Sequence, residues 1–213
     1  MNNSAGRYIS ASLVLLVTSI AQAEELKNSS FEDPVESGLG YNWVSDRAAN
    51  WDRWGGWFNR ETSWTPVFDG QCMVAYHHWR IQGNETSGLY QDIPGLPAGK
   101  PYSFGIKVFK DRGANCDSVE VRLEPFRGGD PIASTVYRMA DLKSDHWNQL
   151  TVVGTNATAG IRVLVIASPG KTNQRRGAMK FDSASFMAGI AETPVVNNAG
   201  IRMSSSYRIS RRR

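Results

Sequence analysis

The stretch "KPYSFGIKVFK", residues 100–110, carries the clearest fold signal in this chain of 213 residues. Tyr102, Phe104, Ile106 and Val108 alternate with small or polar residues. A period of two is typical of a β-strand with one buried face, because successive side chains on a strand point to opposite sides. The stretch therefore predicts a strand that packs one face on a hydrophobic core.

The segments around this strand indicate more strands and no helices. "DSVEVRLEP" (117–125) repeats the alternation, and "GIRVLVIASP" (160–169) is a continuous apolar run typical of a strand covered on both faces. Further strands are expected in "QCMVAYHHW" (71–79), "SGLYQDIPG" (87–95), "WNQLTVVGT" (147–155) and "GAMKFDSASF" (177–186). Pro and Gly pairs separate these runs, and no long amphipathic helical pattern appears. We predict an all-β fold, an antiparallel β-sandwich or jelly roll.

The two ends of the chain differ in composition from this region. Arg7, an apolar run over 11–20 and "AQA" at 21–23 form the pattern of a secretory signal peptide, with cleavage after Ala23. The apolar run is shorter than the roughly 20 residues that a membrane helix needs. We expect a signal peptide over 1–23, a β-sandwich over 24–189 and a disordered basic tail over 190–213, in a secreted or periplasmic protein without a membrane span.

The basic net charge of +4 does not belong to the predicted domain. Six basic side chains lie in the leader or in the last dozen residues, and the remainder is 18 basic against 20 acidic side chains. This near balance gives no electrostatic footprint for nucleic acid, so no nucleic-acid partner is expected. The sequence is compatible with a monomer but does not determine an oligomeric state.

The chain contains two cysteines, Cys72 and Cys116. An exported protein meets an oxidising compartment in which a disulfide between them would persist. The alternative is two separately buried thiols, because a wide spacing of this kind matches no metal-binding pattern.

Aromatic residues are concentrated in "YNWVSDRAANWDRWGGWFNRETSW" (41–64), which holds five of the seven tryptophans. A core strand would not interleave so many indoles with charged and amide side chains. Sugar recognition would, because the C–H face of a pyranose stacks on an aromatic ring while polar side chains bind its hydroxyls. The candidate ligand-binding residues are Trp51, Trp54, Trp57 and Trp64 for stacking, and Arg53, Asn59, His78 and Arg80 for hydrogen bonds.

A structural interpretation of these tryptophans stays open. Trp51, Trp54 and Trp57 are spaced by three, so a helical turn could place them on one side and pack them against the sandwich.

The run "AYHHWR" (75–80) invites an enzymatic interpretation. Because neighbours on a strand point to opposite faces, His77 and His78 are not expected to share one metal or one proton relay. No nucleophile elbow, zinc-binding "HExxH" or phosphate-binding loop is present. We therefore expect a protein that is not an enzyme and has no catalytic residues.

Four segments together resemble the galactose-binding-like jelly rolls, especially carbohydrate-binding modules of the family 4, 9 and 22 type. They are "LKNSSFEDP" (26–34), "SGLYQDIPGLPAGKPYSFGIKVFK" (87–110), "HWNQLTVVGTNATAGIRVLV" (146–165) and "MKFDSASF" (179–186), in the same order as in those modules. The resemblance extends over residues 26–187 and implies the same fold.

The resemblance also implies a structural calcium ion. In such modules a glutamate of the first strand and an aspartate of the last strand help to bind calcium, and the matching residues here are Glu32 and Asp182. Calcium takes six to eight oxygen ligands, and a cation would relieve the repulsion between two carboxylates brought together. The alternative is that both side chains cap turns or contact arginines.

The sequence thus predicts an exported, non-catalytic protein that binds a polysaccharide or glycan by aromatic stacking and contains a structural calcium. One alternative is a structural or adhesive surface protein that uses the fold for protein contacts. The other is a small jelly-roll polysaccharide lyase or hydrolase.

Overall fold

The computed structural model describes residues 26–33, 42–45 (backbone only), 47–55, 58–62, 67–78, 85–170 and 177–189. The predicted signal peptide and basic tail lie outside these residues. Within them, no helix has both the length and the apolar character needed to span a bilayer. The elements are β1 (Asn42–Ser45), β2 (Asp52–Trp54), β3 (Phe58–Thr62), β4 (Met73–Tyr76), β5 (Ser87–Pro94), β6 (Pro101–Lys110), β7 (Cys116–Pro125), β8 (Ala133–Arg138), a short 3-10 helix (Met139–Asp141), β9 (Trp147–Thr155), β10 (Gly160–Pro169) and β11 (Met179–Ala188).

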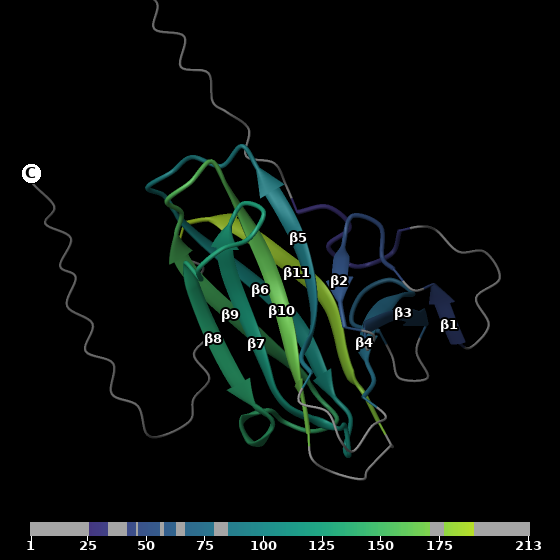
Figure 1. Cartoon of the computed structure of the whole chain (residues 1–213). Coiled ribbons are helices and arrows are strands. Elements are labelled where there is room, and N and C mark those ends of the chain that lie inside the picture. The colour runs from purple at the N-terminus through teal and green to yellow at the C-terminus, as the bar shows by residue number, and fades with distance from the viewer. Residues whose placement is uncertain are drawn as a thin grey trace, which may run out of the picture.

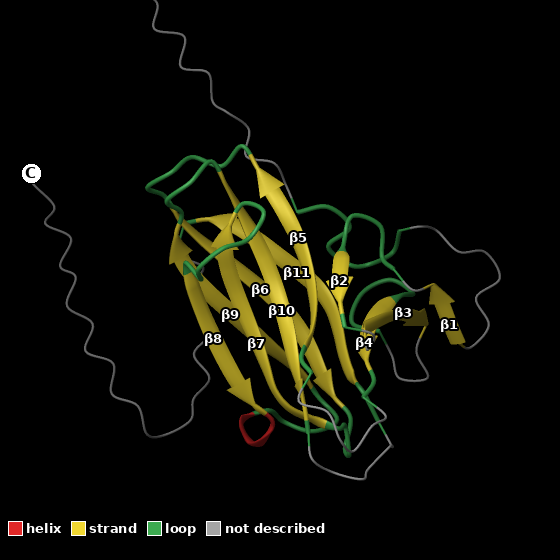
Figure 2. Cartoon of the chain, viewed as in Figure 1, coloured by secondary structure: helices red, strands yellow, loops and turns green. Residues whose placement is uncertain are grey.

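The strands form two sheets that stack face to face (Figures 1 and 2). One sheet has the order β1-β3-β4-β11-β6-β9 and the other has the order β2-β5-β10-β7-β8. The strands in both sheets pair antiparallel. This confirms the predicted all-β sandwich.

The core lies between the two sheets and is built from the alternating residues that the sequence pattern predicts. Phe104, Ile106 and Val108 of β6 are fully buried and belong to one hydrophobic cluster with side chains of the opposite sheet, such as Val163 of β10. Burying a side chain of this size stabilises the fold by roughly 1.5–3 kcal/mol relative to leaving it exposed. The alternation therefore fixes which face of each strand points inward.

Strand β10 lies in the middle of its sheet, between β5 and β7. Its inward residues join the core, and its outward residues Leu164 and Ile166 are also buried. This agrees with the prediction that the apolar run over 160–169 is covered on both faces.

The first described segment, residues 26–33, contributes Leu26 and Phe31 to the core. Phe31 adopts a positive φ of 61° and is fully buried, with its ring 5.1 Å from that of Trp51. A register shift in the pairing of β11 with β6 lies between Asp182 and Ser185, and there the backbone N–H of Ala184 donates to the Ser29 carbonyl at 2.7 Å. The bulge thus ties the last strand to the start of the domain.

Candidate functional site

The outward side chains of the five-stranded sheet form the front face, which faces the viewer in Figure 1. Because side chains alternate along a strand, the residues between core residues point outward. The strand register aligns them in three rows, so that aromatic residues of β2 and β5 lie beside charged residues of β10 and β7. The rows are Trp54, Gly88, Ile166, Glu120 and Val136; then Asp52, Tyr90, Leu164, Arg122 and Ser134; then Asp92, Arg162 and Glu124.

Trp54 is the exposed aromatic residue of this face. Its indole lies against the backbone of β5, where a Cβ on Gly88 would come within 1.8 Å of the ring. Only glycine at position 88 leaves room for this contact. The Trp54 side chain stays 37% exposed, and its ring centroid lies 6.0 Å from that of Tyr90. Trp54 therefore presents an accessible aromatic surface.

Arg162 of β10 is fixed from two sides. Its guanidinium lies 4.2 Å from the centroid of the Tyr90 ring and donates two hydrogen bonds to Asp92, at 2.9 and 2.7 Å. Burial opposes ionisation of Asp92, but the hydrogen bonds from Arg162 and from the Arg127 backbone N–H outweigh it and lower the pKa of Asp92. The hydrogen bond to Asp92 likewise raises the pKa of Arg162. Both groups are charged at neutral pH in a fixed geometry.

Arg122 of β7 forms a second fixed group of charges. Its guanidinium donates to Glu120 at 2.7 and 2.9 Å and to Glu124 at 3.1 Å. The hydrogen bonds to Glu120 are the largest cause of the raised pKa of Arg122. Asp92, Glu120 and Glu124 thus set the orientations of the two arginines before any ligand arrives.

This combination can bind a polyhydroxylated ligand. An aromatic ring offers an apolar surface, and the preformed guanidinium and carboxylate groups offer both donors and acceptors with little loss of side-chain freedom on binding. Ligand sites in proteins commonly combine aromatic side chains with a few fixed polar groups in this way.

The predicted ligand-binding residues are not brought together on one surface. Trp51 is 3% exposed, and its indole N–H donates to the Asn28 carbonyl at 3.0 Å. Asn59 and His78 are also buried, and they are bonded to Arg53 and Asn115 respectively. Burial leaves these three no surface for a polysaccharide, so they support the fold instead.

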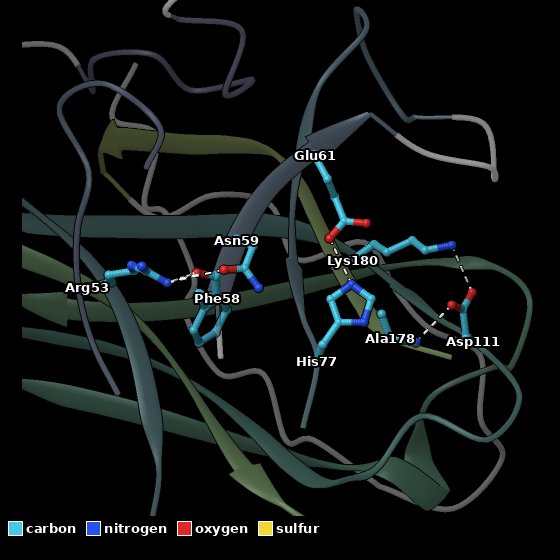
Figure 3. A network of polar contacts seen from close by, with 8 residues as sticks. All are labelled: Arg53, Phe58, Asn59, Glu61, His77, Asp111, Ala178 and Lys180. Atoms are coloured by element: carbon cyan, nitrogen blue, oxygen red, sulfur yellow. Dashed lines mark hydrogen bonds and ion pairs between the residues drawn. The ribbon is translucent and has the colours of Figure 1, made fainter. Parts of the chain in front are cut away.

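The other members of the predicted set divide in two. Trp54 lies on the front face, whereas Arg53 donates to the Phe58 carbonyl and to Asn59 and so joins β2 to β3 (Figure 3). Residues 51–54 are extended and not helical, so the spacing of three does not place Trp51 and Trp54 on one side. Trp57, Trp64 and Arg80 lie outside the described residues.

The outward side of the six-stranded sheet, here called the back face, carries polar residues that are buried. Figure 3 shows Glu61 of β3 directed at His77. The Glu61 carboxylate lies 2.8 Å from Nε2 of His77. Lys180 of β11 pairs with Asp111 at 3.0 Å, and Asp111 also accepts the Ala178 N–H. His77 and His78 have different partners, as the alternation of a strand predicts.

Glu32 and Asp182, the predicted metal ligands, meet at a single loop. Asp182 accepts the backbone N–H groups of Phe68 and Asp69 at 2.9 and 3.0 Å, and Glu32 accepts those of Gln71 and Cys72 at 3.0 and 2.8 Å. Burial raises the pKa of Asp182 to about 6, and the charge of Glu32 adds to the effect.

These two carboxylates are the side-chain groups that the loop brings together as potential metal ligands. Among the described residues, no group of three or more His, Cys, Asp and Glu side chains could hold a metal ion. Further oxygen ligands would have to come from backbone carbonyls and water. Hard carboxylate oxygens and an excess of negative charge nevertheless suit calcium.

The two cysteines form no disulfide, and both are buried thiols. Cys116 donates to the Ser118 carbonyl at 3.3 Å, whereas Cys72 contacts the Arg60 guanidinium at 3.3 Å. Burial raises the pKa of Cys116 to about 12. Of the two alternatives, the structure has the separate thiols.

Sequence reasoning missed most of the front face. Tyr90, Asp92, Arg122 and Arg162 lie inside segments correctly predicted as strands, at positions that alternate with core residues. That alternation marks them as outward-facing. Which outward residues become neighbours depends on the strand order, and the sequence does not state the strand order.

Comparisons with known proteins place this fold. Neither a family model nor a curated protein matches the sequence. A cyclase from Fischerella sp. TAU, solved in complex with 4-(1H-indol-3-yl)butan-2-one, is similar with a TM-score of 0.61 and 16% identity, covering 80% of this chain and 99% of that one. TmCBM61 in complex with β-1,4-galactotriose is similar with a TM-score of 0.54 and 16% identity, covering 78% and 98%.

A third solved structure, the arabinose-bound α-L-arabinofuranosidase MgGH51, has a TM-score of 0.54 and 13% identity, covering 78% of this chain and 26% of that one. Identities this low establish the fold and not the activity. The resemblance to carbohydrate-binding modules is thereby confirmed at the level of the fold: the chain is a β-sandwich of the jelly-roll type that a cyclase, a carbohydrate-binding module and part of a glycosidase also have.

Proposed function

We propose that this protein binds a polysaccharide on its front face without catalysing a reaction on it. The observation that carries the proposal is the contact of exposed Trp54 with Tyr90, beside an Arg162 side chain that Asp92 already holds in place. A pyranose ring can stack on the indole while its hydroxyls reach the fixed charged groups.

The similarity to a module that was solved with β-1,4-galactotriose supports this proposal. The similarity to a cyclase does not oppose it, because one fold commonly hosts several functions. A binding role also fits the front face itself, on which Asp92, Glu120 and Glu124 are engaged with Arg162 and Arg122 instead of being set apart as an acid and a base.

Affinity electrophoresis through gels that contain different polysaccharides tests the proposal. The wild-type protein should be retarded by at least one polysaccharide, and Trp54→Ala should weaken that retardation about tenfold, or ~1.4 kcal/mol. Phe68→Ala is the matched control, since Phe68 is 45% exposed and its ring contacts Trp147 and Lys107 of the six-stranded sheet.

Three results would count against polysaccharide binding at the front face. Retardation that Trp54→Ala leaves unchanged would move the site elsewhere. Binding to a protein partner together with no retardation in any gel would favour the adhesive alternative. Shortening of a polysaccharide that His77→Ala or His78→Ala abolishes would favour the lyase or hydrolase.

We also propose a structural calcium ion between Glu32 and Asp182, with backbone carbonyls and water completing its ligands. The support is the convergence of two carboxylates on one loop and the raised pKa of Asp182, which marks a poorly compensated charge. When bound, calcium would neutralise these charges and hold the loop to both ends of the domain. Calcium should raise the melting temperature of the wild-type protein above its value in EGTA, and Asp182→Asn should remove most of that difference.

Export through the leader at 1–23 is part of the same proposal. If the leader is cleaved as expected, the mass of the protein recovered outside the cytoplasm corresponds to a chain that begins at Glu24. A mass that includes residues 1–23 would contradict it.

A further inference from the structure

We infer that Glu124 and Arg162 recognise a pair of hydroxyls on neighbouring carbons of the sugar, a vicinal diol, and that Gly128 leaves the space this requires. The inference rests on the proposed polysaccharide binding and narrows the class of polysaccharide that would be bound. It depends on one hydrogen-bond donor, from Arg162, and one acceptor, from Glu124. Both lie at the end of the front face that is next to the β7–β8 loop.

Each of the two side chains is held in place by hydrogen bonds from some of its polar atoms and leaves another polar atom for a ligand. Arg162 uses Nε and Nη2 to bind Asp92, and Glu124 uses Oε1 to accept from Arg122. Within the described part of the chain, no hydrogen bond involves Nη1 of Arg162 or Oε2 of Glu124. The register makes these two residues direct neighbours on β10 and β7.

The remaining donor and acceptor border the same small space. A Cβ placed on Gly128 would lie 3.1 Å from Nη1 of Arg162 and 3.6 Å from Oε2 of Glu124. Gly128 has a positive φ of 97°, and its loop crosses in front of β10 in Figure 1. A side chain at position 128 would therefore project into the space between the two groups.

This pair suits a diol better than a single hydroxyl or a charged group. Nη1 can donate to one hydroxyl oxygen while Oε2 accepts from the neighbouring hydroxyl. A carboxylate or sulfate on the sugar would be repelled by Glu124. The side chains of Arg162 and Glu124 are only 19% and 10% exposed, so a hydroxyl missing from the ligand would leave a sheltered polar group without a partner. The site should therefore discriminate strongly against sugars without the diol.

The protein side of the inference is tested by two neighbouring glycine variants, measured against whichever polysaccharide retards the wild-type protein most. Gly128→Ala should weaken binding at least tenfold, because its methyl group would occupy the space of the diol. Gly129→Ala is the matched control: Gly129 also has a positive φ, of 144°, but the atoms nearest to its Cβ would all belong to Pro125, the first at 3.5 Å. Glu124→Gln, which keeps the shape of the side chain and removes its charge, should weaken binding about tenfold.

The ligand side uses polymers of one sugar that differ in linkage. A β-1,4-linked galactan or glucan has a vicinal diol on every internal residue, whereas a β-1,3-linked galactan or glucan has none. Long polymers are used so that chain ends contribute little. We expect the tightest binding among polymers that contain the diol.

The outcomes separate the two proposals. Equal or tighter binding to a β-1,3-linked polymer would overturn the diol inference and leave polysaccharide binding intact. The same conclusion would follow if Gly128→Ala bound as tightly as Gly129→Ala, with both variants shown to be folded by their melting curves. If no polysaccharide binds the wild-type protein, the proposed function itself fails.

Discussion

The front and back faces of this sandwich carry similar residue types in opposite situations. On the back face, Asn59, Glu61 and Lys180 are each less than a tenth exposed. On the front face, Trp54 and the side chains of Arg122 and Asp92 remain a quarter or more exposed. A charged side chain that is enclosed by protein contributes to the fold, whereas one that keeps a polar atom for a ligand can bind through that atom. Glu124 is of the second kind although it is only 8% exposed, because its Oε1 accepts from Arg122 and no described residue donates to its Oε2. Residue type alone therefore does not mark a binding site.

The largest expected effect concerns Asp182 on the back face, measured in EGTA. Its pKa of about 6 in the folded protein lies above the ordinary value of 3.8, so the folded state binds this proton more tightly than the unfolded state. The stabilisation is fully present below about pH 3.8 and is lost as the pH rises through 6. Lowering the pH from 7.5 to 4 should therefore raise the free energy of unfolding of the wild-type protein, relative to Asp182→Asn, by about 2–3 kcal/mol.

Urea unfolding of both proteins across this pH range measures the difference. Parallel curves for the two proteins would show that Asp182 does not titrate as described. Calcium should reduce the pH dependence of the wild-type protein, because it favours the ionised carboxylate.

The next effect tests whether the ion pairs of the back face are structural. Asp111→Ala removes one ion-pair partner of buried Lys180 and an acceptor for the Ala178 N–H, and should lower the free energy of unfolding by about 2 kcal/mol. Denaturant titration measures this loss. Retardation by a polysaccharide should not change. A variant that keeps its stability and loses binding would reverse the roles assigned to the two faces.

A smaller effect is expected at the front face, where Gly88→Ala places a methyl group against the Trp54 indole. The displaced ring should weaken polysaccharide binding about tenfold, or ~1.4 kcal/mol. Isothermal titration of Gly88→Ala, Trp54→Ala and the double variant measures the coupling between the two positions. If the glycine acts through the indole, Gly88→Ala has no further effect once Trp54 is gone. Additive losses would contradict this.

The smallest expected effect concerns the reactivity of the two thiols that are buried between the two faces. Because burial raises the pKa of Cys116 to about 12, its thiol should stay unreactive toward a thiol reagent at pH 8 in the folded protein. Buried Cys72 should behave in the same way. Both thiols should react after denaturation without any reducing agent. A missing thiol signal under those conditions would indicate a disulfide.

Several features of the fold were predictable because they depend on local patterns. The alternation in residues 100–110 and 117–125 fixes inward and outward sides, and the apolar run over 160–169 marks the central strand β10. Asp182 and Glu32 were paired through the resemblance of their segments to a known fold, and the loop over 68–72 does connect them.

The composition of residues 41–64 predicted a binding segment. It did not distinguish the tryptophans that pack in the core from those that lie on the surface. Trp51 and Trp54 have similar local surroundings in sequence, yet one fills the core against Phe31 and the other lies on β5. The choice depends on which strand each residue meets, and those partners lie far away in the chain.

That this chain forms a β-sandwich, and which side of most strands is apolar, could be predicted from the sequence, because the alternation of buried residues is a local property. The position of Trp54, Tyr90, Arg162 and Glu124 on one face follows from the tertiary structure alone, since they come from four strands. The enclosure of Asn59, Glu61 and Lys180 on the back face likewise follows from the tertiary structure. Strand order and the folding back of loops bring such groups together, and both arise from long-range packing.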